Sequence, residues 1–395
     1  MTTAEKVASH HDIDLQLLYF TSTSLSADGE SLAAIGEQDG NPNLFRVDLA
    51  TRAVTQLTHN TEGWLRSYVY FDGTPYRGFA KASVSFDAQR NRLYYLQGRQ
   101  LRTVDFDGNE RILAELPDDQ VTAFTHVSAD GKLICVPTTD EAAFTEDKAW
   151  SERHKGIDAR VQRLGLNSYL RVFSTETGEQ VLCEPVPSAW VTHVQFSPTD
   201  SNVILYNHEW PSDCGIRRVW LWDGKNHTQL RQEGEGRSRL DWTCHEMWER
   251  DGKAVIYHGL YTDGTAYVGR APIDGGEPIE IRLPADWTRY GHFTVGPDET
   301  MLVTDGYYRG AADDEVKVSP WISRLDLDWR DGAIRWRVLG RSDSNWDSQD
   351  SHPHPITDAA GRFVYFTSNV EGRRAIYRLP TAPDEPVADV SLRPP

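Results

Sequence analysis

The feature that most constrains the fold is one unit that repeats along the chain. A short turn, usually containing Asp or Gly, is followed by an apolar strand seven times, at intervals of about 40 to 70 residues. These turns lie at 26–29, 86–88, 128–131, 197–200, 250–252, 296–298 and 358–361. Most units continue to a third strand, such as 44–49 or 375–379, and several to an outer one, such as 53–57 or 180–182.

Asp-Gly turns between alternating strands are hairpin signals, and a repeat of this length without helical periodicity is typical of a β-propeller. We therefore predict an all-β fold, a seven-bladed β-propeller that forms a single domain over residues 1–395. A pair of β-sandwiches is the alternative, but sandwiches do not repeat a turn motif at this period. Two blades carry insertions, at about 141–166 and 306–320. A helix is expected only in the first, and both segments are either functional lids or surface decoration.

Composition limits the partners and the compartment. The formal charge of −18 disfavours nucleic acid and anionic membranes as partners. No apolar run of about 18 residues predicts a membrane span, and residues 1–14 lack the apolar core of a secretory signal. The four cysteines are scattered without CxxC spacing, which favours reduced thiols and a cytoplasmic protein. The oligomeric state is left open.

Histidines recur in register with the turns. Counting six residues back from each turn Asp, or its equivalent, reaches Ser22, Lys81, Phe124, His193, His245, His292 and His354. Four of these seven positions are histidine, in four consecutive blades, although the chain has only 13 His. The strand before such a turn is the innermost one of a blade, so we expect these positions to converge around the central axis.

A second pattern adds metal-ligand chemistry to this register. His352 and His354 flank Pro353, and Gln349 precedes them by three residues. In an extended strand, residues i and i+2 point to the same side, and the proline favours a strand start or edge. With His292 from the preceding blade, these groups suit a borderline divalent ion such as Mn, Fe, Co, Ni or Zn. A polar loop whose histidines bond only backbone is the alternative.

Arginines gather in the same blades. Arg217 and Arg218 precede the strand 219–222, and Arg237 and Arg239 lie shortly before His245. Guanidinium groups are well shaped to bind carboxylates. Ordinary solvated surface is the alternative for Arg217, Arg237 and Arg239, whereas Arg218 is better placed to face the channel mouth.

These groups fit one reaction type. The chain has no Gly-x-Ser-x-Gly elbow, phosphate loop or dinucleotide fingerprint. A metal, a neutral histidine base such as His245 and nearby cations suit abstraction of a proton α to a carboxylate. Applied to a 4-linked uronic acid, that chemistry eliminates the glycosidic oxygen from C4.

The chain resembles the oligogalacturonate lyases, seven-bladed propeller enzymes of a polysaccharide lyase family. The resemblance covers most of the sequence and is best from about 190 to 380. The matching stretches are Trp190-Val191-Thr192-His193, Phe196-Ser197-Pro198, Asn207-His208-Glu209, Arg218-Val219-Trp220, Thr243-Cys244-His245-Glu246-Met247-Trp248, Gly291-His292, and Gln349 through Pro355, which continues into 364–372.

The resemblance implies site roles and a substrate. It implies a manganese-type ion held by His292, Gln349, His352 and His354, with His245 as the base and Arg218 as the partner of the substrate carboxylate. The family's reaction is β-elimination on short galacturonides in the cytoplasm, which releases a 4-deoxy-5-keto uronate. We also expect His193, His208, Arg237 and Lys81 to contribute to binding an anionic uronate oligosaccharide.

The N-terminal blades depart from the family pattern. The family has a His before a Tyr-Phe strand and a Lys after it, and both are missing around Tyr19-Phe20. A related uronate disaccharide is therefore an alternative substrate, and Lys81 is a candidate to replace the lost positive charge. The closing N-terminal strand also looks shortened, so we expect the tail 382–390 to supply an outer strand instead. Two further alternatives are a non-catalytic TolB-like binding or scaffold propeller and a metal-dependent epimerase or hydrolase.

Overall fold

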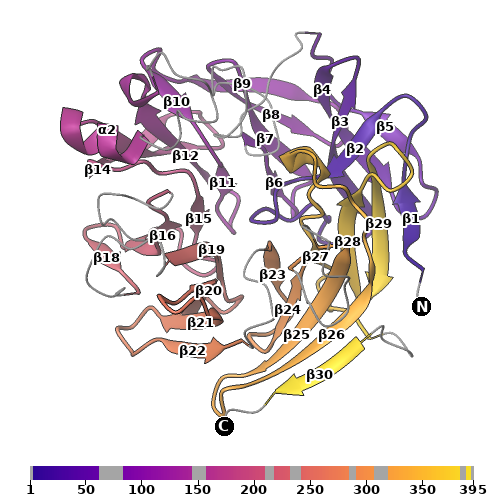
Figure 1. The fold of residues 1–395 in the computed structure, drawn as a ribbon. Helices are drawn as coiled ribbons and strands as arrows, with labels where there is room; N and C mark the ends of the chain where they lie inside the picture. The colour runs from indigo at the N-terminus through magenta and orange to yellow at the C-terminus, as the bar shows by residue number, and fades with distance from the viewer. Residues whose placement is uncertain are drawn as a thin grey trace. The chain divides into compact units, whose positions relative to one another are not determined.

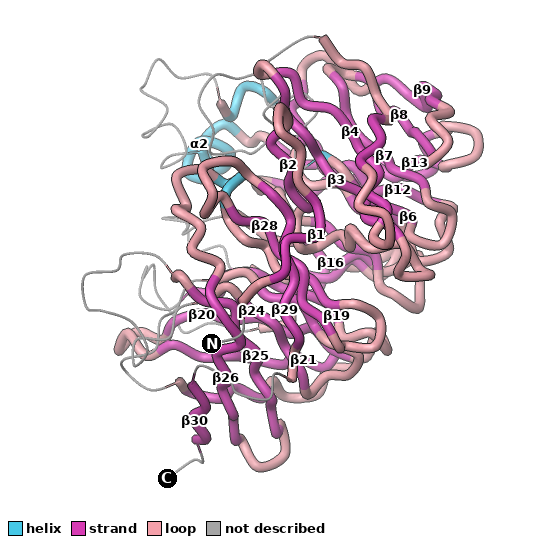
Figure 2. The backbone as a smooth tube through the Cα atoms, turned by 90° about the vertical axis from the view of Figure 1, so that its right-hand side faces the viewer, coloured by secondary structure: helices cyan, strands magenta, loops and turns pink. Residues whose placement is uncertain are grey.

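Antiparallel sheets dominate the structure. The computed structural model describes residues 3–61, 83–144, 157–209, 218–231, 242–283, 291–306 and 319–382, and the backbone of 388–392. These residues form seven sheets, and the α-helix among them is α2 (Ile157–Leu164), which Figure 2 distinguishes from the strands by colour. The predicted all-β fold, a seven-bladed β-propeller, is confirmed. A helix also lies where one was expected, whereas the single-domain extent and the two insertions stay predictions.

The chain divides into two compact units. Unit 1 contains Met1–Gln38, Arg46–Thr55 and Thr243–Pro395, and unit 2 contains Asp39–Phe45 and Gln56–Trp242. Among the described residues, no helix has both the length and the apolar character needed to cross a membrane.

Four sheets are simple meanders in which consecutive strands pair. They are β2 (Asp14–Leu17), β3 (Ser31–Gln38), β4 (Asn41–Asp48) and β5 (Val54–Gln56); β6 (Ser85–Asp87), β7 (Arg92–Gln97), β8 (Gln100–Asp105) and β9 (Glu110–Glu115); β15 (Val194–Phe196), β16 (Ile204–Tyr206), β17 (Trp220–Trp222) and β18 (His227–Gln229); β19 (Trp242–Trp248), β20 (Ala254–Leu260), β21 (Ala266–Pro272) and β22 (Ile279–Arg282).

A fifth sheet, in unit 2, has a divided edge. Its strands are β10 (Gln120–Thr122), β11 (His126–Val127), β12 (Leu133–Asp140), β13 (Asn167–Ser174) and β14 (Gln180–Pro187). Both β10 and β11 pair with β12, so the inner strand of this blade is interrupted. The 3-10 turn η2 (Glu141–Ala143) follows β12.

Two sheets of unit 1 recruit strands from the ends of the sequence. One contains β23 (Phe293–Val295), β24 (Met301–Thr304), β25 (Trp321–Asp328), β26 (Ala333–Arg341) and β30 (Ala388–Leu392). The other contains β27 (Ile356–Thr357), β28 (Phe363–Ser368), β29 (Ala375–Pro380) and β1 (Glu5–Ala8).

The expectation that the tail replaces the N-terminal closing strand is wrong. Strand β1 pairs with β29, and β30 instead extends the preceding sheet beside β26 (Figure 1). Side chains reinforce the β1 pairing, because Arg378 Nε donates to Glu5 Oε2 at 2.7 Å and Lys6 Nζ pairs with Glu371 at 2.5 Å. The shortened strand therefore still completes the last blade.

Four of the repeated turns share one backbone hydrogen bond, in which a glycine amide donates to the carbonyl three residues earlier. In the first, Ser26 Oγ donates to Asp28 Oδ1 at 2.6 Å and the Gly29 amide donates to the Ser26 carbonyl at 2.9 Å. The last turn residue has a left-handed φ, which glycine adopts without a Cβ penalty. Such glycines end four of the turns: Gly29 (φ 74°), Gly131 (66°), Gly252 (71°) and Gly361 (65°). This turn fixes the register between the inner strand and its neighbour.

Apolar side chains pack between neighbouring sheets. In unit 1, Val303, Ile322, Val364 and Phe366 belong to one cluster that joins the β23–β26 sheet to the β27–β29 sheet. In unit 2, a comparable cluster that includes Val172 joins two further sheets. Because this packing supplies the core, the starts of the inner strands are available for polar residues.

Candidate active site

Three consecutive blades of unit 1 bring their register histidines into contact. His245 lies in β19, His292 directly precedes β23, and His354 lies two residues before β27. The ring centroids of His245 and His292 are 4.6 Å apart, and those of His292 and His354 are 4.0 Å apart. The six-residue register therefore identified side chains that meet in the folded unit.

His352 joins two of these rings in a cluster with metal-ligand geometry. One ligand nitrogen each from His292, His352 and His354 lies within 4.8 Å of the other two. His292 and His354 are fully buried, and His352 is half-buried. Three imidazoles at this spacing form a donor set that suits a borderline divalent transition ion.

Asp305 orients His292. The residue follows β24 and lies opposite His292, next to the Phe293–Thr304 pair of the β23–β24 hairpin. Its carboxylate accepts from the His292 amide at 2.6 Å, from His292 Nδ1 at 3.0 Å and from the His354 amide at 3.1 Å. With its proton held on Nδ1, neutral His292 presents the lone pair of Nε2, as metal-binding histidines do when a carboxylate supports them. Asp305 belongs to none of the sequence motifs, although its position across the hairpin from His292 was a signal.

The His352–His354 segment is not the extended strand start that the sequence predicted. His354 has a left-handed φ of 44°, and β27 begins only at Ile356. The Pro353 carbonyl accepts from the Thr367 amide at 2.9 Å, and the His354 amide donates to Asp305. These bonds turn the backbone, and the two histidines converge through this turn rather than through strand alternation.

Gln349 begins the 3-10 turn η5 (Gln349–Ser351), which leads into His352. A capping box links Ser348 and Ser351, and Ser351 Oγ also donates to Asp347 Oδ1 at 2.7 Å. The Gln349 side-chain oxygen is buried. This side-chain oxygen belongs to the turn that leads into His352, which makes Gln349 the candidate fourth ligand.

His245 is held in one tautomer. Its Nδ1 lies 2.8 Å from the Gly291 carbonyl oxygen and 3.0 Å from His258 Nε2. A carbonyl only accepts hydrogen bonds, so neutral His245 carries its proton on Nδ1 and has its basic lone pair on Nε2. The residue is buried and has a left-handed φ of 42°. His258 was missed, because a single histidine in the second strand of a blade belongs to no motif.

Aromatic rings surround these histidines. Phe20 lies 5.2 Å from His245 and 5.3 Å from His292, and Tyr19 lies 4.8 Å from His354, measured between ring centroids. Trp346 lies 4.4 Å from His352. Apolar walls lower the local dielectric and strengthen the charge interactions of the site. The Tyr19-Phe20 pair, around which the family's His and Lys are missing, is thus part of the site's lining.

Unit 2 holds a separate buried network around Arg218. Its guanidinium donates to Glu209 Oε1 and to His193 Nδ1, both at 3.2 Å. The side chains of Arg218 and Glu209 are 7% and 3% exposed. Arginine only donates, so His193 accepts through Nδ1 and, when neutral, carries its proton on Nε2. Glu209 was not predicted as the partner of Arg218, although it stands in one of the stretches that carry the resemblance.

Asn207 and Thr192 complete this network. The Asn207 side-chain oxygen accepts from the Thr192 and His193 amides at 2.9 and 2.8 Å, and its amide group donates to Glu209 Oε2 at 2.8 Å. Thr192 Oγ1 also donates to Glu209 Oε2. His193 further contacts Phe124, its register neighbour, at a ring distance of 4.6 Å.

Of the remaining predicted residues, the structure describes His208 but not Lys81 or Arg237. His208 packs against Trp220 and Tyr206, with ring centroids 5.0 and 5.9 Å away. Burial, helped by the nearby charge of His227, lowers the pKa of His208 to about 3, so its imidazole is neutral near pH 7. Lys81 and Arg237 lie outside the described residues.

Comparisons with known proteins identify the family. The family model for oligogalacturonate lyase matches residues 2–385. An oligogalacturonide lyase from Pectobacterium atrosepticum is 28% identical over 386 residues, covering 93% of this chain and 90% of the relative. An oligogalacturonate lyase from Dickeya dadantii is 27% identical over 387 residues, with the same coverage.

A solved structure agrees at the level of the fold. An oligogalacturonate lyase in complex with manganese superposes with a TM-score of 0.76 at 22% identity, covering 96% of this chain and 93% of that one. The family match over nearly the whole sequence supports an enzyme rather than a non-catalytic propeller. The chain thus belongs to the oligogalacturonate lyase family, and it is a lyase.

Proposed function

We propose that the protein cleaves short uronic-acid oligosaccharides, oligogalacturonides or a related uronate disaccharide, by β-elimination. The observation that carries the proposal is that a histidine base and a cluster of three imidazoles lie side by side in unit 1. His245 has its proton fixed on Nδ1 by the Gly291 carbonyl, and its ring lies 4.6 Å from a histidine of the three-imidazole cluster. The relatives named above support the oligogalacturonide as substrate.

His292, His352 and His354, with the Gln349 carbonyl oxygen, fit a divalent metal ion, for which manganese is our proposal. The donor set supports this fit, and so does the Asp305 carboxylate behind His292, since metal-binding histidines are commonly backed in this way. A similar fold has been solved with manganese bound. When bound, the ion supplies positive charge that stabilises the anion formed when a uronate loses its C5 proton.

In the proposed reaction, His245 Nε2 takes the proton from C5. The electrons of that C–H bond form the C4=C5 double bond as the bond from C4 to the glycosidic oxygen breaks, and the departing oxygen acquires a proton to become a hydroxyl. A base with one fixed tautomer needs no ring reorientation before it accepts the proton. The reaction consumes no water, which separates it from hydrolysis.

Arg218 is our proposed partner of the substrate carboxylate. The contacts of Arg218 with Glu209 and His193 hold the guanidinium in one orientation, and pre-organised cations bind carboxylates well. We propose that His193, His208, Arg237 and Lys81 contribute to substrate binding. Since His208 is neutral, its contribution is stacking or hydrogen bonding rather than charge. We also propose a cytoplasmic location.

The test is turnover of a panel of uronic-acid disaccharides, beginning with digalacturonate, with and without added Mn²⁺. We expect an unsaturated uronate, detected by its absorbance, and a total product mass equal to that of the substrate. A mass gain of one water would indicate a hydrolase, and an uncleaved isomer would indicate an epimerase. No turnover of any uronide with Mn²⁺ present would exclude the proposed activity.

A further inference from the structure

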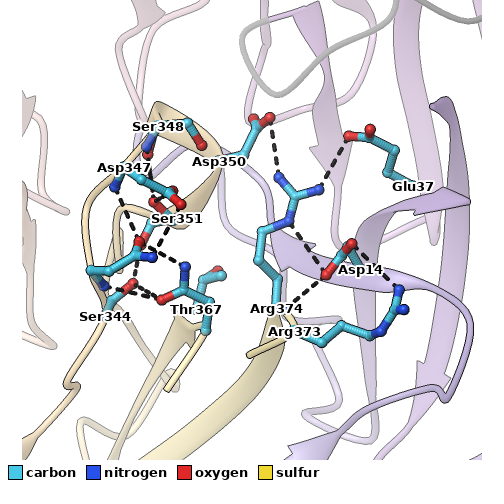
Figure 3. Close-up of polar contacts among 12 residues, drawn as sticks. Asp14, Glu37, Ser344, Asp347, Ser348, Asp350, Ser351, Thr367, Arg373 and Arg374 are labelled. Atoms are coloured by element: carbon cyan, nitrogen blue, oxygen red, sulfur yellow. Dashed lines mark hydrogen bonds and ion pairs between the residues drawn. The ribbon is translucent and has the colours of Figure 1, made fainter. Parts of the chain in front are cut away.

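Arg374 joins three segments of unit 1 through their carboxylates, as Figure 3 shows. Its side chain, only 13% exposed, contacts Asp350 Oδ2 at 3.2 Å, Glu37 Oε2 at 3.1 Å and Asp14 Oδ1 at 4.0 Å. Its backbone amide also donates to Asp14 Oδ1 at 2.9 Å. Asp14 begins β2, Glu37 lies near the end of β3, and Arg374 directly precedes β29.

Asp350 connects this cation to the proposed metal ligands. It is the central residue of η5, between Gln349 and Ser351, and His352 directly follows that turn. The side-chain bonds of Ser348 and Ser351 fix the turn internally, whereas the Asp350–Arg374 pair ties it to the β2–β3 sheet and to β29. A 3-10 turn of three residues has few internal bonds, so an outside anchor contributes much of its rigidity.

Arg374 stays charged in this position. Burial of the guanidinium opposes its charge, and the carboxylates of Asp350, Glu37 and Asp14 outweigh that effect, so the pKa of Arg374 is raised. Three acidic partners also satisfy the guanidinium. A structural link to the turn therefore fits Arg374 better than substrate binding does.

We propose that Arg374 is a positioning residue for the metal site. It holds Asp350 in place and, through Asp350, keeps the side chains of Gln349 and His352 where they would bind the ion. The inference rests on the proposed ion at His292, Gln349, His352 and His354. Groups that orient metal ligands from outside the coordination shell typically change metal affinity about 10- to 100-fold when removed. Because Arg374 acts through one intervening residue, we expect about tenfold.

The test measures Mn²⁺ affinity of the full chain, by electron paramagnetic resonance of free Mn²⁺ or by calorimetry. The variants are Arg374→Gln, Asp350→Asn, the double variant and Arg374→Lys, which keeps a cation. The matched control is Arg373→Gln, because the side chain of Arg373 contacts Asp14 at 3.4 Å and makes no ion pair with the described residues of the turn. Thermal unfolding of each metal-free protein reports stability separately.

We expect about tenfold weaker Mn²⁺ binding for Arg374→Gln and for Asp350→Asn, and no further loss in the double variant, because both changes break one link. Arg374→Lys should recover part of the affinity, and Arg373→Gln should bind as the wild type does. Unchanged affinity in Arg374→Gln, or additive losses in the double variant, would overturn the positioning role and leave the metal site intact. If Arg374→Gln does not fold, Asp350→Asn decides, since Asp350 is more exposed. A wild-type protein that binds no Mn²⁺ would instead remove the metal site and this inference with it.

Discussion

Replacing Asp305 by asparagine changes one atom of the carboxylate that supports two histidines of the cluster. In the wild type, Asp305 Oδ1 accepts a hydrogen bond from the His292 amide. Asp305 Oδ2 accepts from His292 Nδ1 and from the His354 amide. An asparagine offers one acceptor oxygen and one amide group, which donates. If the amide group faces His292 Nδ1, it favours the tautomer that carries the proton on Nε2, where the metal should bind.

The size of the effect follows from this exchange. Metal binding then requires moving the His292 proton from Nε2 to Nδ1. The Nδ1–H would then face the N–H of the asparagine amide, in a site where the side chains at 292 and 305 are fully buried. Loss of such an outer partner typically weakens metal binding about 10- to 100-fold, which corresponds to about 1.4 to 2.7 kcal/mol. We expect Asp305→Asn to fall in this range and Asp305→Ala to unfold more easily as well, because three N–H donors lose their acceptor.

Mn²⁺ titration followed by electron paramagnetic resonance measures this loss directly. Asp326→Asn is the matched control, because Asp326 lies in the same sheet and pairs with Arg324 and Arg337 rather than with a histidine. That variant should change stability and leave Mn²⁺ affinity unaltered. Equal Mn²⁺ affinity of Asp305→Asn and the wild type would refute the reasoning that the carboxylate sets the His292 tautomer.

Three further predictions concern His245 and Gly291 of unit 1 and His208 of unit 2. His245→Gln should lower kcat about 10²- to 10⁴-fold with Mn²⁺ affinity retained, measured by product absorbance and metal titration, and retained turnover would remove His245 as the base. Gly291→Ala should lower kcat and should lower the free energy of unfolding by about 1 to 3 kcal/mol, because its Cβ would lie 2.4 Å from the Gly306 Cα. Steady-state kinetics and urea unfolding test these two effects, and a variant equal to the wild type contradicts them. The folded-state pKa of His208 is depressed from 6.5 to about 3, so the unfolded state binds more protons between these values and stability should fall as the pH drops through that window. His208→Phe should flatten this part of the stability profile, and an unchanged profile counts against a buried neutral His208.

The sequence predicts the register histidines because a turn follows the inner strand at the same distance in each blade. The turns at 250–252, 296–298 and 358–361 differ in sequence but follow the inner strand at the same distance, so counting back from them finds the same place in each blade, and His245, His292 and His354 meet as expected. A local rule thus carries over to three-dimensional contact whenever each repeat keeps the same geometry.

The partners of these residues escape the same rule. His258 stands on a second strand and Asp305 directly follows one, where no turn count marks them, and Glu209 contacts Arg218 directly within a network that also holds Asn207 and Thr192. The left-handed φ of His354 arises from bonds to Asp305 and β28, which are distant in the chain. Propensity and spacing do not encode such long-range restraints.

The pairing of β1 with β29 has a consequence for the order in which the protein matures. Lys6 and Glu371 meet across 365 residues, so the blade that carries His352 and His354 keeps an open edge until its last strand has been synthesised. Metal capture at these histidines should therefore be a late event in biogenesis. A ribosome-bound chain arrested before β29 also lacks β30, so it should complete only the blades that need neither strand and should fail to retain Mn²⁺.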